Sequence, residues 1–239
     1  MSLKVENKKI LILGASSDIG LKTLNLFLEN NWKVFAHYNK NNKNLLKFKK
    51  EGENIELIKF DFKNINNIEK KIKKSFYHGY HSIINLIGYI DNKSFIKTQI
   101  KDTITSITIN ALAPNLIMKN NLNYMYKNKW GRVVNGSALG IPYGGGEYSY
   151  NYNISKHCLE FIPSKFREWA KKNILINNLR IGHTNTKIHK KMKKSLFGKK
   201  RIKLIPVNRM ATSEEMAEYL YFLGSEKNSF MTNETISST

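Results

Sequence analysis

Tyr152 and Lys156 are the residues of this chain whose types and spacing point most directly to a chemical reaction. On an α-helix, residues four positions apart lie on one face, with their Cβ atoms about 6 Å apart. An ammonium group held there stabilises a tyrosinate and lowers the pKa of a phenol, which is ordinarily about 10. The pair therefore predicts proton transfer near neutral pH, of the kind that interconverts a ketone and an alcohol.

Spacing alone does not separate this pair from chance. The chain has 12 tyrosines and 35 lysines among 239 residues, so about two Tyr-x-x-x-Lys pairs are expected at random. Two occur, and the second is Tyr89 with Lys93. Only Tyr152 follows a serine in register: Ser137 comes directly after an apolar run that reads as a buried strand. Open α/β sheets bind their ligands at the carboxyl ends of such strands.

Short apolar runs alternate with longer mixed segments along the whole chain, which is typical of a parallel sheet with crossover helices. The predicted strands are Lys9–Leu13, Lys33–Tyr38, Ile55–Phe60, Ser82–Ile87, Gly131–Gly136, Leu175–Arg180 and Glu234–Ser237. The predicted helices are Ile19–Glu29, Ile65–Phe76, Ile104–Asn128, Tyr150–Lys172 and Ser213–Leu223, the last with Ser213 as its N-cap. We expect one α/β domain over residues 1–239, with a doubly wound seven-stranded parallel sheet and helices on both faces.

Charge and composition limit the classes of partner. The net charge is +22, but the excess is almost entirely lysine and no nucleic-acid-binding motif accompanies it, so we predict no nucleic-acid partner. No apolar stretch reaches a membrane span and no signal peptide is visible. The six histidines have no metal-ligand spacing, and no metal site is predicted. The lone Cys158 fits a buried position on a helix and a cytoplasmic protein.

The first predicted strand leads into a glycine turn, Gly14–Gly20, and then into a helix. A strand, turn and helix in this order place backbone N–H groups and the helix N-terminus against a pyrophosphate, as in a Rossmann fold. Gly14 permits the tight turn, and Gly20 permits close packing of the helix on the sheet. The hydroxyls of Ser16 and Ser17 are suited to bond phosphate or ribose.

With these motifs in order along nearly its whole length, the chain resembles the short-chain dehydrogenase/reductase family, and within it the 3-oxoacyl-(acyl-carrier-protein) reductase-like members. The resemblance rests on Gly14–Gly20, Asp61-Phe62, Asn85-Leu86-Ile87-Gly88, Asn110, Ser137, Tyr152-Asn153-Ile154-Ser155-Lys156 and Ile181–Thr186. The family's middle glycine in the turn is Asp18 here. The family is usually dimeric or tetrameric, so a homodimer or homotetramer is implied. Phe161, Ile162 and Phe166 are equally suited to a subunit contact and to the core.

The resemblance implies roles for individual residues. Tyr152 would protonate the carbonyl oxygen while a hydride moves from the nicotinamide to the carbonyl carbon. Ser137 would orient that oxygen, Lys156 would lower the Tyr152 pKa and bind the nicotinamide ribose, and Asn110 would hold a water beside Lys156. The implied nucleotide-binding residues are Gly14, Ser16, Ser17, Asp18, Ile19, Gly20, Tyr38, Asn39, Lys40, Asp61, Phe62, Asn85, Gly88, Tyr152, Lys156, Gly182, Thr184 and Thr186.

The end of the second strand favours NADP(H) over NAD(H). An acid at this position bonds the ribose 2′-hydroxyl and repels a 2′-phosphate. The chain has no acid over residues 38–43, where Lys40 and Lys43 are placed to pair with a phosphate.

The substrate remains open at the level of sequence. Lys187–Lys203 holds nine basic residues and no acid, within the segment, about 187–208, where the family keeps its substrate lid. It indicates an anionic or carrier-bound substrate, such as a 3-oxoacyl thioester or an acidic or nucleotide-linked sugar, or simply a solvated charge run. A nucleotide-binding protein without turnover, acting as a sensor or interaction partner, is the alternative function.

Overall fold

The computed structural model describes residues 8–63, 67–187, 200 and 202–238. Seven parallel strands form one sheet in the order β3-β2-β1-β4-β5-β6-β7. The strands are β1 (Lys9–Leu13), β2 (Lys33–Tyr38), β3 (Ile55–Lys59), β4 (Ser82–Asn85), β5 (Gly131–Ala138), β6 (Ile174–Ile181) and β7 (Thr235–Ser237). Every predicted strand is confirmed: β1 and β2 have the predicted ends, and the ends of the others differ by one or two residues.

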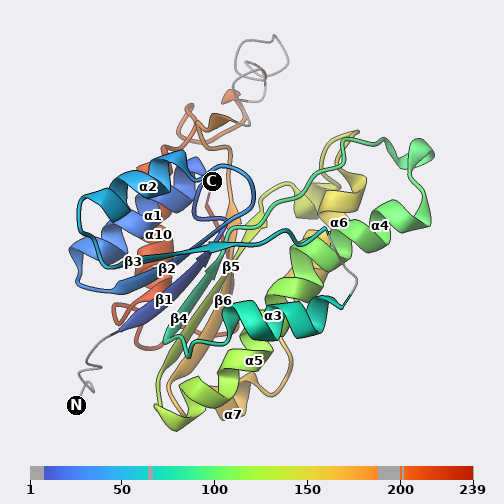
Figure 1. The fold of residues 1–239 in the computed structure, drawn as a ribbon. Coiled ribbons are helices and arrows are strands. Elements are labelled where there is room, and N and C mark those ends of the chain that lie inside the picture. Colours follow the sequence, from blue (N-terminus) through green and yellow to red (C-terminus); the bar gives the residue numbers. More distant parts are fainter. Residues whose placement is uncertain (1–7, 64–66, 188–199, 201, 239) are drawn as a thin grey trace.

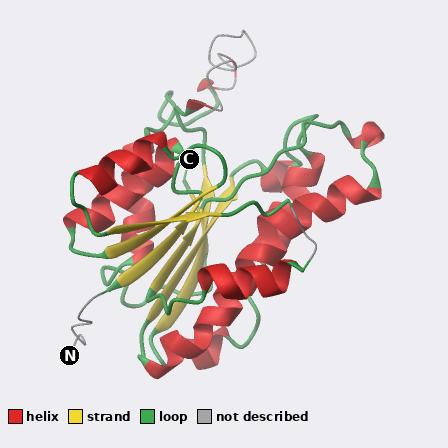
Figure 2. Cartoon of the chain, viewed as in Figure 1, coloured by secondary structure: helices red, strands yellow, loops and turns green. Residues whose placement is uncertain are grey.

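Helices cover both faces of the sheet, as predicted (Figures 1 and 2). Helices α1 (Asp18–Glu29) and α10 (Ser213–Gly224) pack together on one face. The other face carries α3 (Ile68–Phe76), α4 (Ile100–Ile107), α5 (Ala113–Lys127), α6 (Tyr150–Glu160) and α7 (Phe166–Ala170). The remaining elements are α2 (Lys43–Lys50), which lies against β3, and the short turns η1 (Phe95–Lys97), η2 (Thr108–Leu112) and η3 (Ile141–Tyr143).

The core has two layers because the sheet is buried on both sides. Successive residues of a strand point to opposite faces, so Ile10 and Ile12 join the cluster under α1 and α10 while Leu11 and Leu13 join the cluster under α3 and α5. This explains why the strands read as continuous apolar runs rather than as alternating ones.

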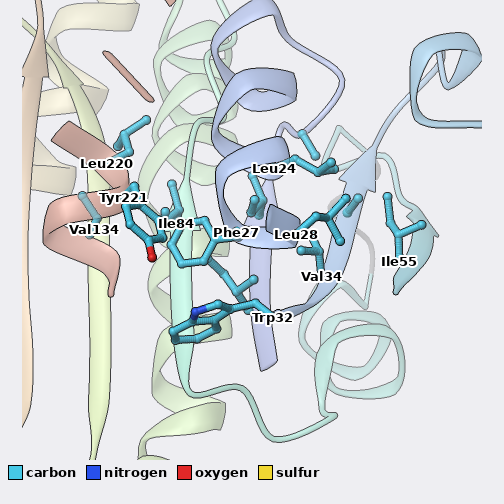
Figure 3. Packing of buried hydrophobic residues seen from close by; sticks show 14 of the residues in the cluster. Leu24, Phe27, Leu28, Trp32, Val34, Ile55, Ile84, Val134, Leu220 and Tyr221 are labelled. Carbon is cyan, nitrogen blue, oxygen red and sulfur yellow. The ribbon is translucent and has the colours of Figure 1, made fainter. Parts of the chain in front are cut away.

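Aromatic rings close the base of the first cluster (Figure 3). The Phe27 ring meets Trp32 edge-on at 5.1 Å between centroids and Tyr221 at 4.9 Å. Tyr221 comes from α10 and Phe27 from α1, so these contacts bind the two ends of the chain into one layer. Burying each such ring contributes roughly 1.5–3 kcal/mol to stability.

The order of the strands creates the place for a ligand. After β3 the chain crosses to the other side of β1, so β1 and β4 are neighbours whose connections run in opposite directions. At such a switch point the carboxyl ends of the strands open a crevice. Among the described residues, no helix has the length and apolar character needed to cross a bilayer.

Two predictions about helix ends are wrong. The helix predicted over Tyr150–Lys172 stops at Glu160 and a separate helix resumes at Phe166. Pro163 explains the break, since proline lacks an N–H and forces the preceding residue out of the helical region. The N-cap of α10 is Thr212 and not Ser213: the Thr212 hydroxyl accepts from the Glu215 N–H, and the Glu215 carboxylate accepts from the Thr212 N–H.

Other helix boundaries differ less. The helix predicted from Ile104 begins four residues earlier, at Ile100, and contains a π-turn, η2. Helix α2 was not predicted, because its lysine-rich sequence buries only Leu45. The start predicted at Ile65 lies outside the described residues.

The prediction that Cys158 is buried is also wrong, since it is exposed on α6. Neighbouring segments cover the side of α6 that carries Asn151 and Ser155. Thr103 donates a hydrogen bond to Asn151, and Asn110 donates one to Ser155. Cys158 lies one turn beyond the last of these contacts, where the side is left open.

Candidate active site

Helix α6 presents Tyr152 and Lys156 on one face toward the carboxyl ends of β4 and β5. The Lys156 Nζ donates to the carbonyl oxygen of Ile87 at 2.8 Å and to that of Gly136 at 2.6 Å. The lysine is 1% exposed, and its Nζ lies 5.6 Å from the centroid of the Tyr152 ring. Two main-chain acceptors, one from the segment after β4 and one from β5, therefore hold a cation beside the tyrosine.

Burial sets the proton affinities of this pair. It lowers the pKa of Lys156 to about 7, against a smaller opposite effect from the Glu160 carboxylate. It raises the pKa of Tyr152 to about 12. The predicted lowering of the Tyr152 pKa by Lys156 is not found in this structure, because the loss of solvation dominates. Tyr152 is a neutral phenol, able to donate a proton.

Ser137 lies on the strand that supplies one of the Lys156 acceptors, one residue after Gly136. Its Oγ donates to Oε1 of Glu160 at 2.7 Å. Glu160 in turn accepts from Arg180 through both carboxylate oxygens, at 2.8 and 2.7 Å. Sequence reasoning predicted Ser137 but missed Glu160 and Arg180, although Glu160 stands four residues after Lys156 on the same helix.

Asn110 is fully buried within the π-turn η2. Its Oδ1 accepts from the Tyr89 N–H at 2.8 Å, and its Nδ2 donates to the Tyr89 carbonyl at 2.9 Å and to Ser155 Oγ at 2.8 Å. It therefore ties the segment after β4 to α6, on the helix that carries Tyr152 and Lys156. A π-turn inserts one residue into a helix and is frequent at functional sites.

The turn after β1 has the form expected for pyrophosphate binding. Gly14 has φ of +78°, and a Cβ there would lie 2.9 Å from the Leu86 carbonyl oxygen. A Cβ on Gly20 would lie 2.6 Å from the Gly14 oxygen. Ser17 caps α1 by accepting from the Gly20 N–H at 3.0 Å. The N–H groups of Asp18 and Ile19 open the helix and have no intrahelical acceptor, which leaves them for an anion.

A histidine that sequence reasoning missed, His37 on β2, holds the glycine turn after β1 by a hydrogen bond to its main chain. His37 Nδ1 accepts from the Gly14 N–H, and its Nε2 bonds the Phe60 carbonyl, both at 3.1 Å. These partners place the proton on Nε2. Burial lowers the pKa of His37 to about 4, so the ring is neutral at physiological pH. The only sequence signal was a polar residue inside an apolar strand.

Asp18, which replaces a glycine of the family pattern, contacts the segment after β6. Its Oδ2 accepts from the Lys187 N–H at 2.8 Å, and its Oδ1 lies 3.5 Å from Lys187 Nζ. The phosphate turn is thereby joined to the base of the predicted lid. Residues 188–199 and 201 of that lid lie outside the described residues.

At the end of β2, Tyr38 is half-buried while Asn39 and Lys40 are exposed. Asn39 Nδ2 donates to Asp61 Oδ1 at 3.4 Å, and the same oxygen accepts from the Lys63 N–H at 3.0 Å. The Phe62 side chain is 4% exposed and packs on His37 and Phe76. Only the main chain of Phe62 is therefore placed to meet an adenine.

Two predicted residues after β4 fit a ligand beside Tyr152. The Asn85 Oδ1 accepts from the Ile87 N–H at 3.0 Å, whereas its buried Nδ2 has no partner among the described residues. A buried donor without an acceptor is costly unless a ligand or water supplies one. A Cβ on Gly88 would lie 3.8 Å from the Tyr152 ring. These features, with the free N–H groups of the turn, fit a nicotinamide nucleotide.

A cavity of about 580 Å³ opens at the carboxyl ends of β5 and β6. Gly182 and His183 line it, and Leu204–Val207, Met216 and Tyr219 give it apolar walls. Thr184 is buried and forms an isolated parallel β-bridge with Ala211. Its Oγ1 donates to the Gly182 carbonyl at 3.0 Å, and its own carbonyl accepts from the Thr186 N–H at 2.8 Å. Of the residues predicted to bind nicotinamide, Gly182 lines this cavity, whereas Thr184 and Thr186 are not among its lining residues.

Comparison with known proteins agrees with this fold. A family model described as enoyl-(acyl carrier protein) reductase matches residues 14–238. The 3-oxoacyl-[acyl-carrier-protein] reductase FabG of Buchnera aphidicola subsp. Schizaphis graminum is 29% identical over 99% of this chain and 88% of its own length.

Two solved structures have the same architecture. A 3-oxoacyl (acyl-carrier-protein) reductase from Agrobacterium tumefaciens C58 with NADP bound superposes with a TM-score of 0.84, at 21% identity, over 96% of this chain and 92% of its own. ElxO with NADP bound has a TM-score of 0.78 at 26% identity, over 97% and 96% of the two chains. The chain therefore belongs to the short-chain dehydrogenase/reductase family and is an NAD(P)-dependent oxidoreductase of that family.

Proposed function

We propose that this protein is an NADP(H)-dependent reductase that interconverts a ketone and a secondary alcohol, with Tyr152 as the proton donor and acceptor. The observation that carries the proposal is the buried Lys156, held on the carbonyls of Ile87 and Gly136 beside the Tyr152 ring. A buried lysine without a carboxylate bonded to its Nζ is costly to the fold. A role for the positive charge of Lys156 in catalysis would account for this cost.

The residues divide the work as follows. The bound nicotinamide supplies or takes up the hydride at the carbonyl carbon. Tyr152 gives its proton to the carbonyl oxygen or recovers it from the alcohol, which is worth about 100- to 10,000-fold in rate for groups of this kind. Lys156 places positive charge beside the tyrosine and the nicotinamide ribose. Asn110 keeps α6 in register with the segment after β4.

The preference for NADPH over NADH is a prediction of its own. Residues 38–43 carry no acid, and Lys40 and Lys43 are exposed there, so the 2′-phosphate gains charge pairing that NADH does not offer. We expect the KM for NADPH to be lower than that for NADH by at least about tenfold, which corresponds to one charge-assisted contact. Lys40→Gln should narrow this ratio, and a preference of the wild type for NADH would contradict the assignment.

For the substrate we propose a 3-oxoacyl thioester rather than a sugar. The cavity beside Gly182 and His183 has walls from Leu204–Val207, Met216 and Tyr219, which suit an acyl chain. Relatives named 3-oxoacyl-[acyl-carrier-protein] reductase support the same class. The basic stretch Lys187–Lys203 would attract the phosphate groups of a carrier.

A nicotinamide absorbance assay over a panel of ketones tests the proposal. The panel contains 3-oxoacyl-CoA thioesters, neutral ketones and keto sugars, each at low and high ionic strength. We expect the thioesters to be reduced fastest, with a KM that rises with salt because charge attraction is screened. Binding of NADPH without turnover of any member would instead support the sensor or interaction function. A KM for the thioesters that does not change with ionic strength would show that the basic stretch does not attract the substrate.

We also propose a domain organisation, a cellular location and an oligomeric state for the protein. We place residues 1–239 in one nucleotide-binding domain with a substrate lid at about 187–208, in the cytoplasm, which the single cysteine favours. A homodimer or homotetramer is supported by apolar side chains exposed on η1 and α4, among them Phe95, Ile96 and Ile100. Phe161 is 72% exposed and would extend such a contact, whereas Ile162 packs against the core.

A further inference from the structure

His37 lies on β2 where two separate parts of the predicted nucleotide site meet. Its side chain is buried, and its Nδ1 accepts from the Gly14 N–H of the glycine turn at 3.1 Å. On the other side of the ring, Nε2 bonds the Phe60 carbonyl, also at 3.1 Å. The main-chain carbonyl of His37 accepts from the Ala15 N–H at 2.9 Å. One residue therefore binds the first two N–H groups of the turn.

The turn needs such contacts because of the glycine with which it begins. Gly14 has φ of +78°, and glycine adopts positive and negative φ about equally well. The local sequence therefore does not by itself hold the conformation in which the N–H groups of Asp18 and Ile19 are left for an anion. The hydrogen bonds from His37 hold that conformation before a nucleotide binds. A site that is organised in advance loses less conformational entropy on binding, which raises affinity.

The Phe60 carbonyl decides which form of the His37 ring is present. A neutral imidazole has a proton on one nitrogen and a lone pair on the other. Because a carbonyl only accepts, the proton stays on Nε2 and the lone pair of Nδ1 faces Gly14. The Phe62 ring packs edge-on against the His37 ring, with 5.0 Å between centroids. Phe60 directly precedes Asp61 and Phe62, the segment predicted to contact the adenine, so the ring joins that segment to the glycine turn.

We propose that His37 is a positioning residue for nucleotide capture, which holds the glycine turn in the form that binds a pyrophosphate and ties this turn to the adenine segment. This role rests on the proposed binding of NADPH and is independent of the proposed chemistry of Tyr152. His37 acts through Gly14 and Phe60 rather than on the reacting atoms.

A second histidine supplies a matched control at the other end of β1. His81 directly precedes β4, is as buried as His37, and its Nδ1 accepts from the Lys9 N–H at 3.1 Å. Burial lowers the pKa of both histidines to about 4, so both rings are neutral at physiological pH. The two rings thus make the same kind of bond at opposite ends of one strand. Only His37 lies at the carboxyl edge of the sheet, where a nucleotide binds.

Two amide substitutions separate the two nitrogens of the His37 ring. Asparagine keeps an acceptor near the position of Nδ1, whereas glutamine places its amide near Nε2 and leaves the Gly14 N–H without a partner. We expect His37→Gln to raise the dissociation constant of NADPH at least about tenfold, because the turn leaves its binding conformation to satisfy this N–H. His37→Asn should stay within about threefold of the wild type, since it keeps the acceptor. Fluorescence titration measures both constants.

The kinetic split and the control variant separate positioning from a general loss of stability. At saturating NADPH, kcat for ketone reduction should be unchanged within about twofold in His37→Gln, whereas a smaller folded fraction would lower kcat as well. His81→Gln leaves the Lys9 N–H unpaired in the same way and should bind NADPH with the wild-type dissociation constant. An unchanged constant in folded His37→Gln, an equal rise in His81→Gln, or an equal rise in His37→Asn overturns the proposal.

Nitrogen-15 NMR of the histidines gives a readout that needs no turnover. At pH 7 the His37 ring should be neutral, with its proton on Nε2 and a hydrogen-bonded lone pair on Nδ1. A charged ring, or a proton on Nδ1, overturns the proposal. A wild type that binds NADPH but reduces no ketone would overturn the proposed function alone, because the NADPH titrations would still decide the role of His37.

Discussion

Tyr152→Phe is expected to lower ketone reduction by about 100- to 10,000-fold, the contribution typical of a positioned proton donor. The substitution removes one oxygen and leaves the ring that packs beside Gly88 and Lys156. The nucleotide should therefore bind with an unchanged dissociation constant, measured by fluorescence titration. A fall in kcat with intact binding assigns the phenol to the chemical step rather than to the fold.

The other Tyr-x-x-x-Lys pair supplies a matched control. No hydrogen bond of the described residues uses the Tyr89 hydroxyl, although the Tyr89 main chain holds Asn110. Tyr89→Phe should keep wild-type kcat, because the main-chain contacts survive the loss of that hydroxyl. Equal losses in both variants, or activity retained in Tyr152→Phe, would remove Tyr152 from the role of donor.

The comparison of these two pairs indicates what the sequence can and cannot predict. Helical spacing placed Tyr152 and Lys156 on one face, and the order of strands placed that face at the carboxyl edge of β4 and β5; both are confirmed. These features follow from local periodicity and from the rules of parallel sheets. The break at Pro163 was also readable, since proline ends a helix by its own geometry.

Features that depend on side chains meeting from distant elements were not predictable. The partner of the Ser137 hydroxyl comes from α6 and is fixed by Arg180 on β6, so three separate segments must be in place before its direction is defined. The π-turn around Asn110 gives no pattern in the sequence. His37 reads as an ordinary strand residue until the turn of Gly14 is seen to rest on it.

The pH dependence of nucleotide capture should follow Lys156. Burial lowers the pKa of Lys156 to about 7 and raises that of Tyr152 to about 12. The lysine is then an ammonium below pH 7 and loses its charge as the pH rises, while the tyrosine stays protonated. Because kcat/KM for NADPH reports groups of the free protein, it should be constant at low pH. It should fall as the pH rises through about 7, where the anionic nucleotide loses this cation.

Lys156→Met tests whether that titration belongs to the lysine. The variant should lower kcat/KM for NADPH by at least about 100-fold, as expected when a buried charge partner of a catalytic group is lost, and its pH profile should have no limb near 7. Lys93→Met, at the same spacing in the other pair, removes a lysine bound to Asp102 and should keep both the rate and the limb. A limb near pH 7 that persists in Lys156→Met would assign the titration to another group of the free protein. The low pKa of Lys156 would then reflect only its burial, and its charge would have no part in nucleotide capture.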